Sequence, residues 1–323
     1  MAENLQWRFW DETAERWRTH DFWREALAWH GTATPHVLPR VATFGLISAL
    51  ICAVAGPRLA IPVGPHEVAG AVLGLLLVLR TNAGYERWWE ARRLWGGIVN
   101  QARNLAIQAL AYGPGAPPWR DQVVRLTIAF AHVARHSLRG EREIPDVAAL
   151  LGAGPAARIA RAAHMPNAVA REIGRSLRQA HEGEAMDGFA FMQAEGQRAT
   201  LIDHVGACER ILKTPLARVY SIKIRQFIVL FLVTLNFALL DRLKSNWLVP
   251  PVLMLVAYPV LAVDLIGSEL QNPFSRRNLG HLPLEDICGT IEANLLGLVA
   301  EEAEAEGEAG TSGLDRETGD GVG

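Results

Sequence analysis

The sequence has few cysteines and few charged residues. Its cysteines, Cys52, Cys208 and Cys288, lie far apart in a chain of 323 residues, which excludes a disulfide framework and a cysteine-based zinc site. Charged residues make up only 20% of the chain, against roughly 25% in ordinary soluble domains. The 32 basic and 34 acidic residues nearly balance, so we expect no general polyanion binding and no nucleic-acid partner.

Motifs typical of enzymes are also missing. The sequence contains no glycine-rich phosphate loop and no Gly-x-Ser-x-Gly, so nothing in it indicates an enzyme. His132 and His136 have the i, i+4 spacing of metal ligands on a helix, but the segment lacks a catalytic glutamate and no nearby acid completes a site. We interpret them as surface or packing histidines, and we expect no metal and no cofactor.

Hydrophobic residues form half of the chain and are concentrated in four blocks. A membrane-spanning helix needs about 20 apolar residues, and the shorter blocks reach this length only with their semi-polar flanks. The blocks come as two pairs with short polar turns, which indicates two transmembrane hairpins; a soluble helical bundle is the alternative. Asp264 is the one acid inside them, and we expect it to pair with a nearby arginine. The blocks are residues 41–56, 68–79, 227–240 and 247–267.

The basic residues predict the orientation in the membrane. Residues 80–225 contain 21 of the 32 Lys and Arg, whereas the two hairpin turns contain three, Arg58, Arg242 and Lys244. Because basic loops stay in the cytoplasm, both hairpin tips should face outward. We therefore expect a multi-pass protein of the inner (plasma) membrane with both termini in the cytoplasm.

These features divide the chain into six parts. The segments 121–138 and 198–212 repeat apolar residues at the 3.6-residue period of a helix, so the central domain should be helical. The end of the chain is rich in acids and glycine and is predicted to be disordered. The parts are cytosolic N-terminal helices (1–40), a first transmembrane hairpin (41–79), a cytosolic helical domain (80–221), a second transmembrane hairpin (222–267), a cytosolic C-terminal segment (268–300) and the acidic tail (301–323).

The most informative stretch, residues 75–104, combines an apolar helix with tryptophan and charge. Trp88 and Trp89 are typical of a membrane interface, and Arg87 could stack on their rings while pairing with Glu86 and Glu90. On the residues alone, we interpret this group as an anchor for the helix rather than as a substrate site.

Three motifs, in this order, resemble those of the bacterial bestrophin homologues. They are RTN-x3-ERWWEAR-x-LWG at residues 80–96, CERI followed by TP at 208–215, and ELQNPF at 269–274, the last followed by DIC-x-TIE at 286–292. The resemblance extends from about residue 7 to residue 298. It implies an all-α membrane protein that forms a homopentameric ion channel, with four transmembrane helices and a helical cytosolic domain per subunit. It also implies structural roles for the motif residues Arg80, Arg87, Trp88, Trp89, Asn272, Pro273 and Phe274.

In that family the second membrane helix lines a narrow hydrophobic neck. The corresponding residues here are Ala71, Leu75 and Leu79, whose i, i+4, i+8 spacing places them on one helical face. Helix–helix packing is the alternative role for the two leucines. The family has a second constriction in its cytosolic domain, for which Phe189 is the candidate.

Eukaryotic relatives bind calcium through acids that follow the Asn-Pro-Phe motif. In this sequence residues 275–280 read SRRNLG, and two arginines disfavour a calcium site. The resemblance therefore predicts a calcium-independent channel with a hydrophobic gate that passes chloride and other small anions. A channel selective for monovalent cations is the alternative, followed by a membrane protein without a channel or a membrane enzyme. The partners would be the lipid bilayer, small inorganic ions and further copies of the chain.

Overall fold

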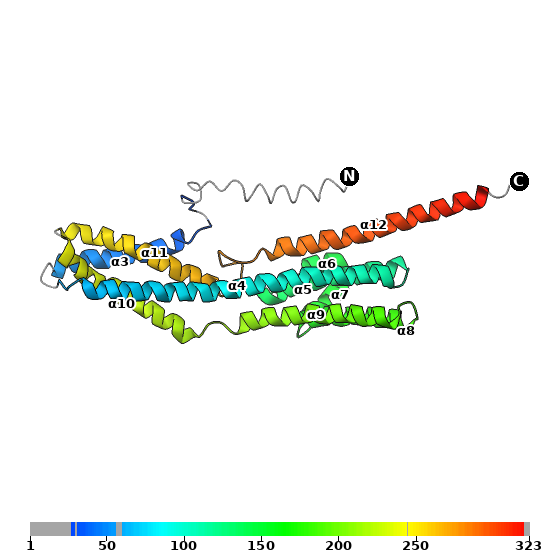
Figure 1. Cartoon of the computed structure of the whole chain (residues 1–323), viewed down its shortest axis with the longest axis horizontal. Helices are drawn as coiled ribbons and strands as arrows, with labels where there is room; N and C mark the ends of the chain where they lie inside the picture. The colour runs from blue at the N-terminus through cyan, green and yellow to red at the C-terminus, as the bar shows by residue number, and fades with distance from the viewer. Residues whose placement is uncertain (1–26, 30, 56–59, 244, 320–323) are drawn as a thin grey trace. The chain divides into compact units, whose positions relative to one another are not determined.

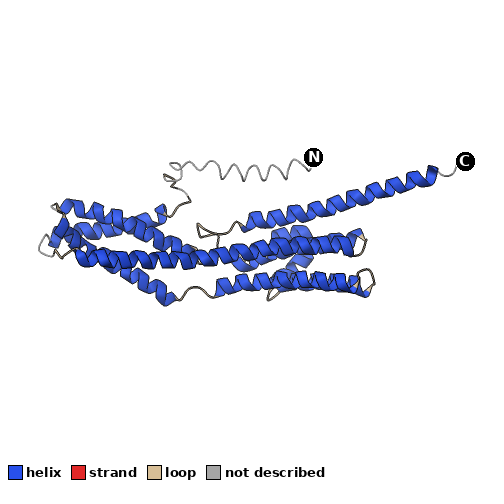
Figure 2. Ribbon diagram, viewed as in Figure 1, coloured by secondary structure: helices blue, strands red, loops and turns tan. Residues whose placement is uncertain are grey.

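The computed structural model describes residues 27–29, 31–55, 60–243 and 245–319 (Figure 1). Within these ranges every regular element is a helix, as Figure 2 shows. Most of the expected N-terminal helices, residues 1–40, lie outside the described residues. The chain divides into unit 1 (Met1–Asn82 and Val219–Ser268) and unit 2 (Ala83–Arg218 and Glu269–Gly323).

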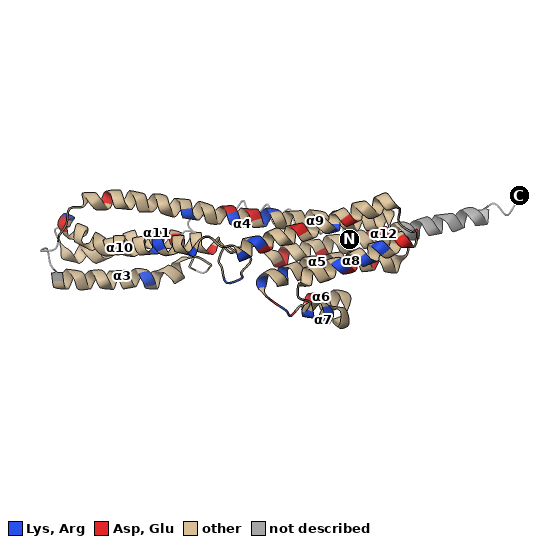
Figure 3. Cartoon of the chain, turned by 90° about the horizontal axis from the view of Figure 1, so that it is seen from below, with Lys and Arg blue, Asp and Glu red and all other residues tan. Residues whose placement is uncertain are grey.

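Unit 1 contains the four apolar blocks of the sequence, each mainly within its own helix; the fourth begins in a short 3-10 helix, η2 (Asn246–Leu248). The helices are α3 (Thr34–Ala55), α4 (Gly64–Tyr112, of which unit 1 takes the first part), α10 (Arg218–Arg242) and α11 (Val249–Glu269). All four are long and apolar enough to cross a membrane; α3, with 22 residues, is about 33 Å long. Few charged residues lie along α3, α10 and α11 (Figure 3). The prediction of four membrane-spanning helices is confirmed.

The core of unit 1 is small and apolar. Leu73 and Leu77 of α4 are buried with Leu232 of α10 and Leu253 of α11. Other large apolar side chains point away from this core, and such faces contact lipid or other protein in a membrane. They include Leu46, Leu50, Val72, Leu75, Leu79, Val229, Leu230 and Leu255.

Unit 2 is built around α5 (Pro117–Arg139), which is buried along most of its length. Proline at its first positions and Gly140, with φ of 73°, set its two ends. Helices α8 (Met165–Glu182), α12 (Leu284–Gly319) and α6 (Pro145–Leu151) pack against it. The remaining helices are the second part of α4, α7 (Ala153–Arg161) and α9 (Gly188–Lys213). The predicted helical segments 121–138 and 198–212 lie inside α5 and α9.

The acidic tail differs from its prediction. Helix α12 continues to Gly319, so the expectation of disorder is wrong for residues 301–319. Residues 301–306 alternate mainly between glutamate and alanine, both strong helix formers. A helix that begins in the core of unit 2 can extend through such a sequence despite its charge.

Candidate functional site

The three candidate neck residues lie on an exposed face of α4 within unit 1. Leu75 and Leu79 are 61% and 51% exposed, and Ala71 is exposed as well. Leu73 and Leu77, on the opposite face, are buried in the core of unit 1. One face of α4 thus holds unit 1 together, and the described residues leave the face with Ala71, Leu75 and Leu79 exposed.

A buried ion pair follows directly after Leu79. The Arg80 guanidinium is buried and its Nη1 donates to Oδ1 of Asp264 in α11. Arg225 of α10 donates from Nε to the other oxygen of Asp264 at 3.3 Å, and from Nη2 to Ser268 Oγ at 3.2 Å. The expectation that Asp264 pairs with a nearby arginine is confirmed, and the contacts link α4, α10 and α11.

The Arg87 side chain makes different contacts from those expected. Its guanidinium donates to three backbone carbonyls, those of Gln271 at 3.3 Å, Thr214 at 2.8 Å and Ile211. Glu90 accepts a hydrogen bond from Arg210 at 2.6 Å rather than from Arg87, on which it acts through its charge alone. Arg87 therefore ties α4 to the C-terminal end of α9 and to the segment after α11, all within unit 2.

The two tryptophans beside Arg87 differ in their surroundings. Trp88 donates its indole N–H to the carbonyl of Gly280 at 2.7 Å and packs against the core of unit 2. Trp89 is about half exposed. Trp88 thus anchors α4 to the loop before α12, which agrees with a structural role.

The Asn-Pro-Phe motif forms a closed turn between α11 and α12. The Asn272 side chain accepts a hydrogen bond from the Phe274 N–H at 3.2 Å, and the Phe274 ring is fully buried. The Pro273 carbonyl accepts from Leu282 N–H at 2.7 Å, and Asn278 donates to the Asn272 carbonyl at 2.9 Å. The side-chain contact of Asn272 and the burial of Phe274 give these two motif residues a structural role.

An arginine–glutamate cluster follows this turn. Glu285, in the first turn of α12, accepts from Arg139 of α5, with one contact at 2.9 Å, and from Arg276 at 2.7 Å. The hydrogen bonds from Arg139 lower the pKa of Glu285 to about 2. The carboxylate near residues 275–280 is therefore already bound by two guanidinium groups.

Phe189 lies at the N-terminal end of α9 with its side chain 88% exposed. The Asp187 side chain caps this end and accepts from the N–H groups of Phe189 at 2.8 Å and Ala190 at 3.2 Å. Phe191 instead stacks on His181, with ring centroids 4.9 Å apart. Of these two phenylalanines, only Phe189 has an aromatic face free for another molecule or another copy of the chain.

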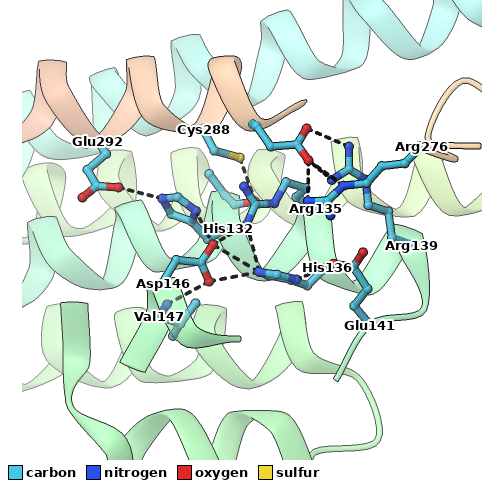
Figure 4. Close-up of polar contacts among 12 residues, drawn as sticks. His132, Arg135, His136, Arg139, Glu141, Asp146, Val147, Arg276, Cys288 and Glu292 are labelled. Carbon is cyan, nitrogen blue, oxygen red and sulfur yellow. Dashed lines mark hydrogen bonds and ion pairs between the residues drawn. The ribbon is translucent and has the colours of Figure 1, made fainter. Parts of the chain in front are cut away.

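His132 and His136 belong to a partly buried polar cluster in unit 2 (Figure 4). His132 contacts Asp146 of α6 through Nδ1 and Glu292 of α12 through Nε2, both at 2.9 Å. His136 contacts Glu141 through Nδ1 at 2.7 Å and Asp146 through Nε2 at 2.9 Å. The His136 Nε2 atom also lies 2.9 Å from Nη2 of Arg135, so this ring lies between acidic side chains and a guanidinium group.

The acids that contact the two histidines lie outside α5, and reasoning from the sequence did not find these contacts. Partial burial raises the pKa of the Asp146 carboxyl, but hydrogen bonds from His132 and His136 outweigh burial and hold that pKa well below its usual range. Arg135 adds a further contact to Asp146. Among the described residues no group of His, Cys, Asp and Glu is arranged to hold a metal ion, and the cluster joins α5, α6 and α12.

Comparison with known proteins agrees with this architecture. The sequence model described as bacterial and fungal bestrophin protein matches residues 14–297. A voltage-dependent anion channel-forming protein of Synechocystis sp. is 32% identical over 87% of this chain and 93% of its own length. One of Ralstonia nicotianae is 31% identical over 88% and 94%.

Solved structures give the same result. The crystal structure of a bestrophin homologue from Klebsiella pneumoniae superposes with a TM-score of 0.75 at 26% identity, covering 82% of this chain and 98% of that one. The likeness and the four apolar helices show an integral membrane protein. The chain belongs to the bacterial and fungal bestrophin family.

Proposed function

We propose that this protein is an anion channel, assembled as a homopentamer with one pore on the fivefold axis. The observation that supports this best is the exposed apolar face of α4, with Leu75 and Leu79, in a chain whose relatives are named anion channel-forming proteins. In a single copy, the four described helices of unit 1 pack around their own small core and enclose no pore. Further copies are needed to surround a conducting space.

In the pentamer, five α4 helices present Ala71, Leu75 and Leu79 to the axis. The three residues form three stacked apolar rings, and a constriction of this kind closes by losing its water rather than by binding an ion. The Ala71 ring is the widest because its side chain is the smallest. Phe189 forms a second constriction, in the part of the pore lined by unit 2.

The proposal also covers the orientation of the chain in the membrane and channel opening that does not depend on calcium. The distribution of Lys and Arg supports cytoplasmic termini and a cytoplasmic unit 2, in the inner membrane of a cell. Residues 275–280 carry no acid, and the nearby Glu285 is bound by Arg139 and Arg276. Channel opening is therefore independent of calcium.

The test of the proposed function is electrical. Purified protein in a planar bilayer under a potassium chloride gradient should give currents that reverse near the chloride equilibrium potential. Reversal near the potassium potential would mean a cation channel, and absence of current would remove the channel assignment. Light scattering of the protein in detergent should give the mass of five chains, and a stable monomer or dimer would contradict the assembly.

A further inference from the structure

A groove of about 410 Å³ in unit 1 is lined by residues of α3, α10 and α11, and no residue of α4 is among its lining residues. Its walls and floor are apolar, and two of its lining residues, Ile228 and Leu261, are buried in the core of the unit. Val229 lines the groove and is about half exposed, so the groove opens on the outer surface of α10. The lining residues that matter here are Arg40, Phe44, Arg225, Ile228, Val229 and Leu261.

One end of this groove is basic. Arg40 lies in the second turn of α3, Arg225 in the third turn of α10 and Asp264 in the turn before the last of α11. Because α3 and α10 begin where α11 ends, the three residues are at the same level of the helical bundle. Arg40 forms no ion pair with any residue in the described ranges, and Asp264 is already bound by Arg80 and Arg225. The groove is thus lined by two guanidinium groups, those of Arg40 and Arg225, and by one carboxylate, that of Asp264, whose charge Arg80 already compensates.

We propose that this groove binds an anionic phospholipid. The phosphate would be held by Arg40 and Arg225, and an acyl chain would lie along Phe44, Ile228 and Val229. Arginine near the end of a membrane helix lies at the depth of the lipid headgroups, where basic pockets between helices recognise acidic lipids. The planar guanidinium also suits a phosphate with two acceptor oxygens. The site lies outside the proposed pore, and it requires insertion in a membrane but not conduction.

The charge of the site is tested by adding phosphatidylglycerol or phosphatidylcholine to the purified full-length protein in detergent. Native mass spectrometry counts bound lipid, and thermal unfolding measures stabilisation. Phosphatidylglycerol should be retained and should raise the unfolding temperature more than phosphatidylcholine does. Arg40→Gln should weaken this binding about fivefold, which is about 1 kcal/mol for one basic residue near the lipid surface. Arg242→Gln, an exposed arginine in the last turn of α10, is the control and should retain wild-type binding.

The acyl-chain part is tested by filling the groove without changing its charge. Val229→Trp should reduce phosphatidylglycerol binding at least as much as Arg40→Gln. The matched control is Leu230→Trp, because Leu230 is the next residue, is at least as exposed, and does not line the groove. That control should retain the lipid.

Three results would overturn the proposal. Equal phosphatidylglycerol binding by Arg40→Gln and Arg242→Gln would remove the phosphate site. If inorganic phosphate stabilised the protein as much as the lipid does, and Val229→Trp still bound phosphatidylglycerol like the wild type, the groove would be a site for a free anion only. A change of oligomer mass in Val229→Trp, with lipid per subunit unchanged, would mean that another subunit covers the groove. None of these readouts depends on current, so failure here and failure of the channel proposal are distinguishable.

Discussion

Asp264→Asn should destabilise the protein strongly, because it leaves the Arg80 charge in a place that water does not reach. Arg80 is almost fully buried, and among the described residues its Nε and Nη2 atoms have no hydrogen-bond partner, whereas its Nη1 donates to Asp264. Removing one member of a buried ion pair costs about 3–5 kcal/mol. Arg225 loses less, because its side chain is exposed to solvent. We expect the midpoint of thermal unfolding to fall by on the order of 10 °C.

The assay is tryptophan fluorescence during heating in detergent, with elution from a sizing column as a second readout. Asp241→Asn, an exposed acid at the other end of α10, should change neither. The double variant Arg80→Met with Asp264→Leu removes both charges and should recover most of the lost stability, since apolar pairs of similar size often replace buried ion pairs without loss. The reasoning would be refuted if the double variant unfolded at a lower temperature than Asp264→Asn, or if Asp264→Asn had the same unfolding midpoint as the wild type.

The remaining predictions concern unit 2. Arg87→Lys should lower the stability of the protein by about 2 kcal/mol, measured by thermal unfolding, because an ammonium group cannot reach the three carbonyls that the guanidinium group reaches. The control is Arg92→Lys, at an exposed arginine of the same helix. Equal effects of the two substitutions would contradict the structural role of Arg87. The pKa of Glu285 is depressed to about 2, so its contribution is present above its ordinary pKa of about 4.3 and is lost as pH falls toward 2. Glu285→Gln should therefore lower the free energy of unfolding by about 1–2 kcal/mol at neutral pH, a figure reduced to allow for the partial exposure of the carboxylate. The difference from the wild type should vanish near pH 2. A difference that does not change with pH would exclude the ion pair as its source. Chelation of calcium should leave bilayer currents unchanged, whereas a current that disappears with chelator and returns with micromolar calcium would show a calcium site.

The membrane helices were predictable because a single property, the length of an apolar run, identifies them. Runs of apolar residues long enough to cross a bilayer have few alternatives, and α3, α10 and α11 follow their blocks closely. The continuity of α4 over 49 residues was less evident, since Gly96 and Gly97 lie inside it. The structure gives Gly97 a packing reason: a Cβ there would meet the ring of His204 in α9 at 2.4 Å. A glycine at a close helix–helix contact cannot be told from a helix break by local propensity.

The polar contacts of unit 2 were not predictable, because their partners are far apart in sequence. His132 reaches Glu292, 160 residues away, and Arg87 reaches Thr214, 127 residues away. Local reasoning instead paired Arg87 with an acid in the next helical turn, a common contact that the fold does not use. The tail shows the opposite error, since composition suggested disorder where glutamate and alanine continue α12.

The most direct test of the proposed channel compares three leucines of one helix in single-channel recordings. Leu75→Ala and Leu79→Ala widen an apolar ring on the exposed face of α4, so each should raise conductance and weaken the closed state, with assembly nearly intact. Leu77→Ala empties a buried position in the core of unit 1, so it should cost about 2–5 kcal/mol and reduce oligomer yield, with the conductance of surviving channels unchanged. The reverse pattern, with Leu77 controlling the current and Leu79 the stability, would contradict the assignment of the pore face.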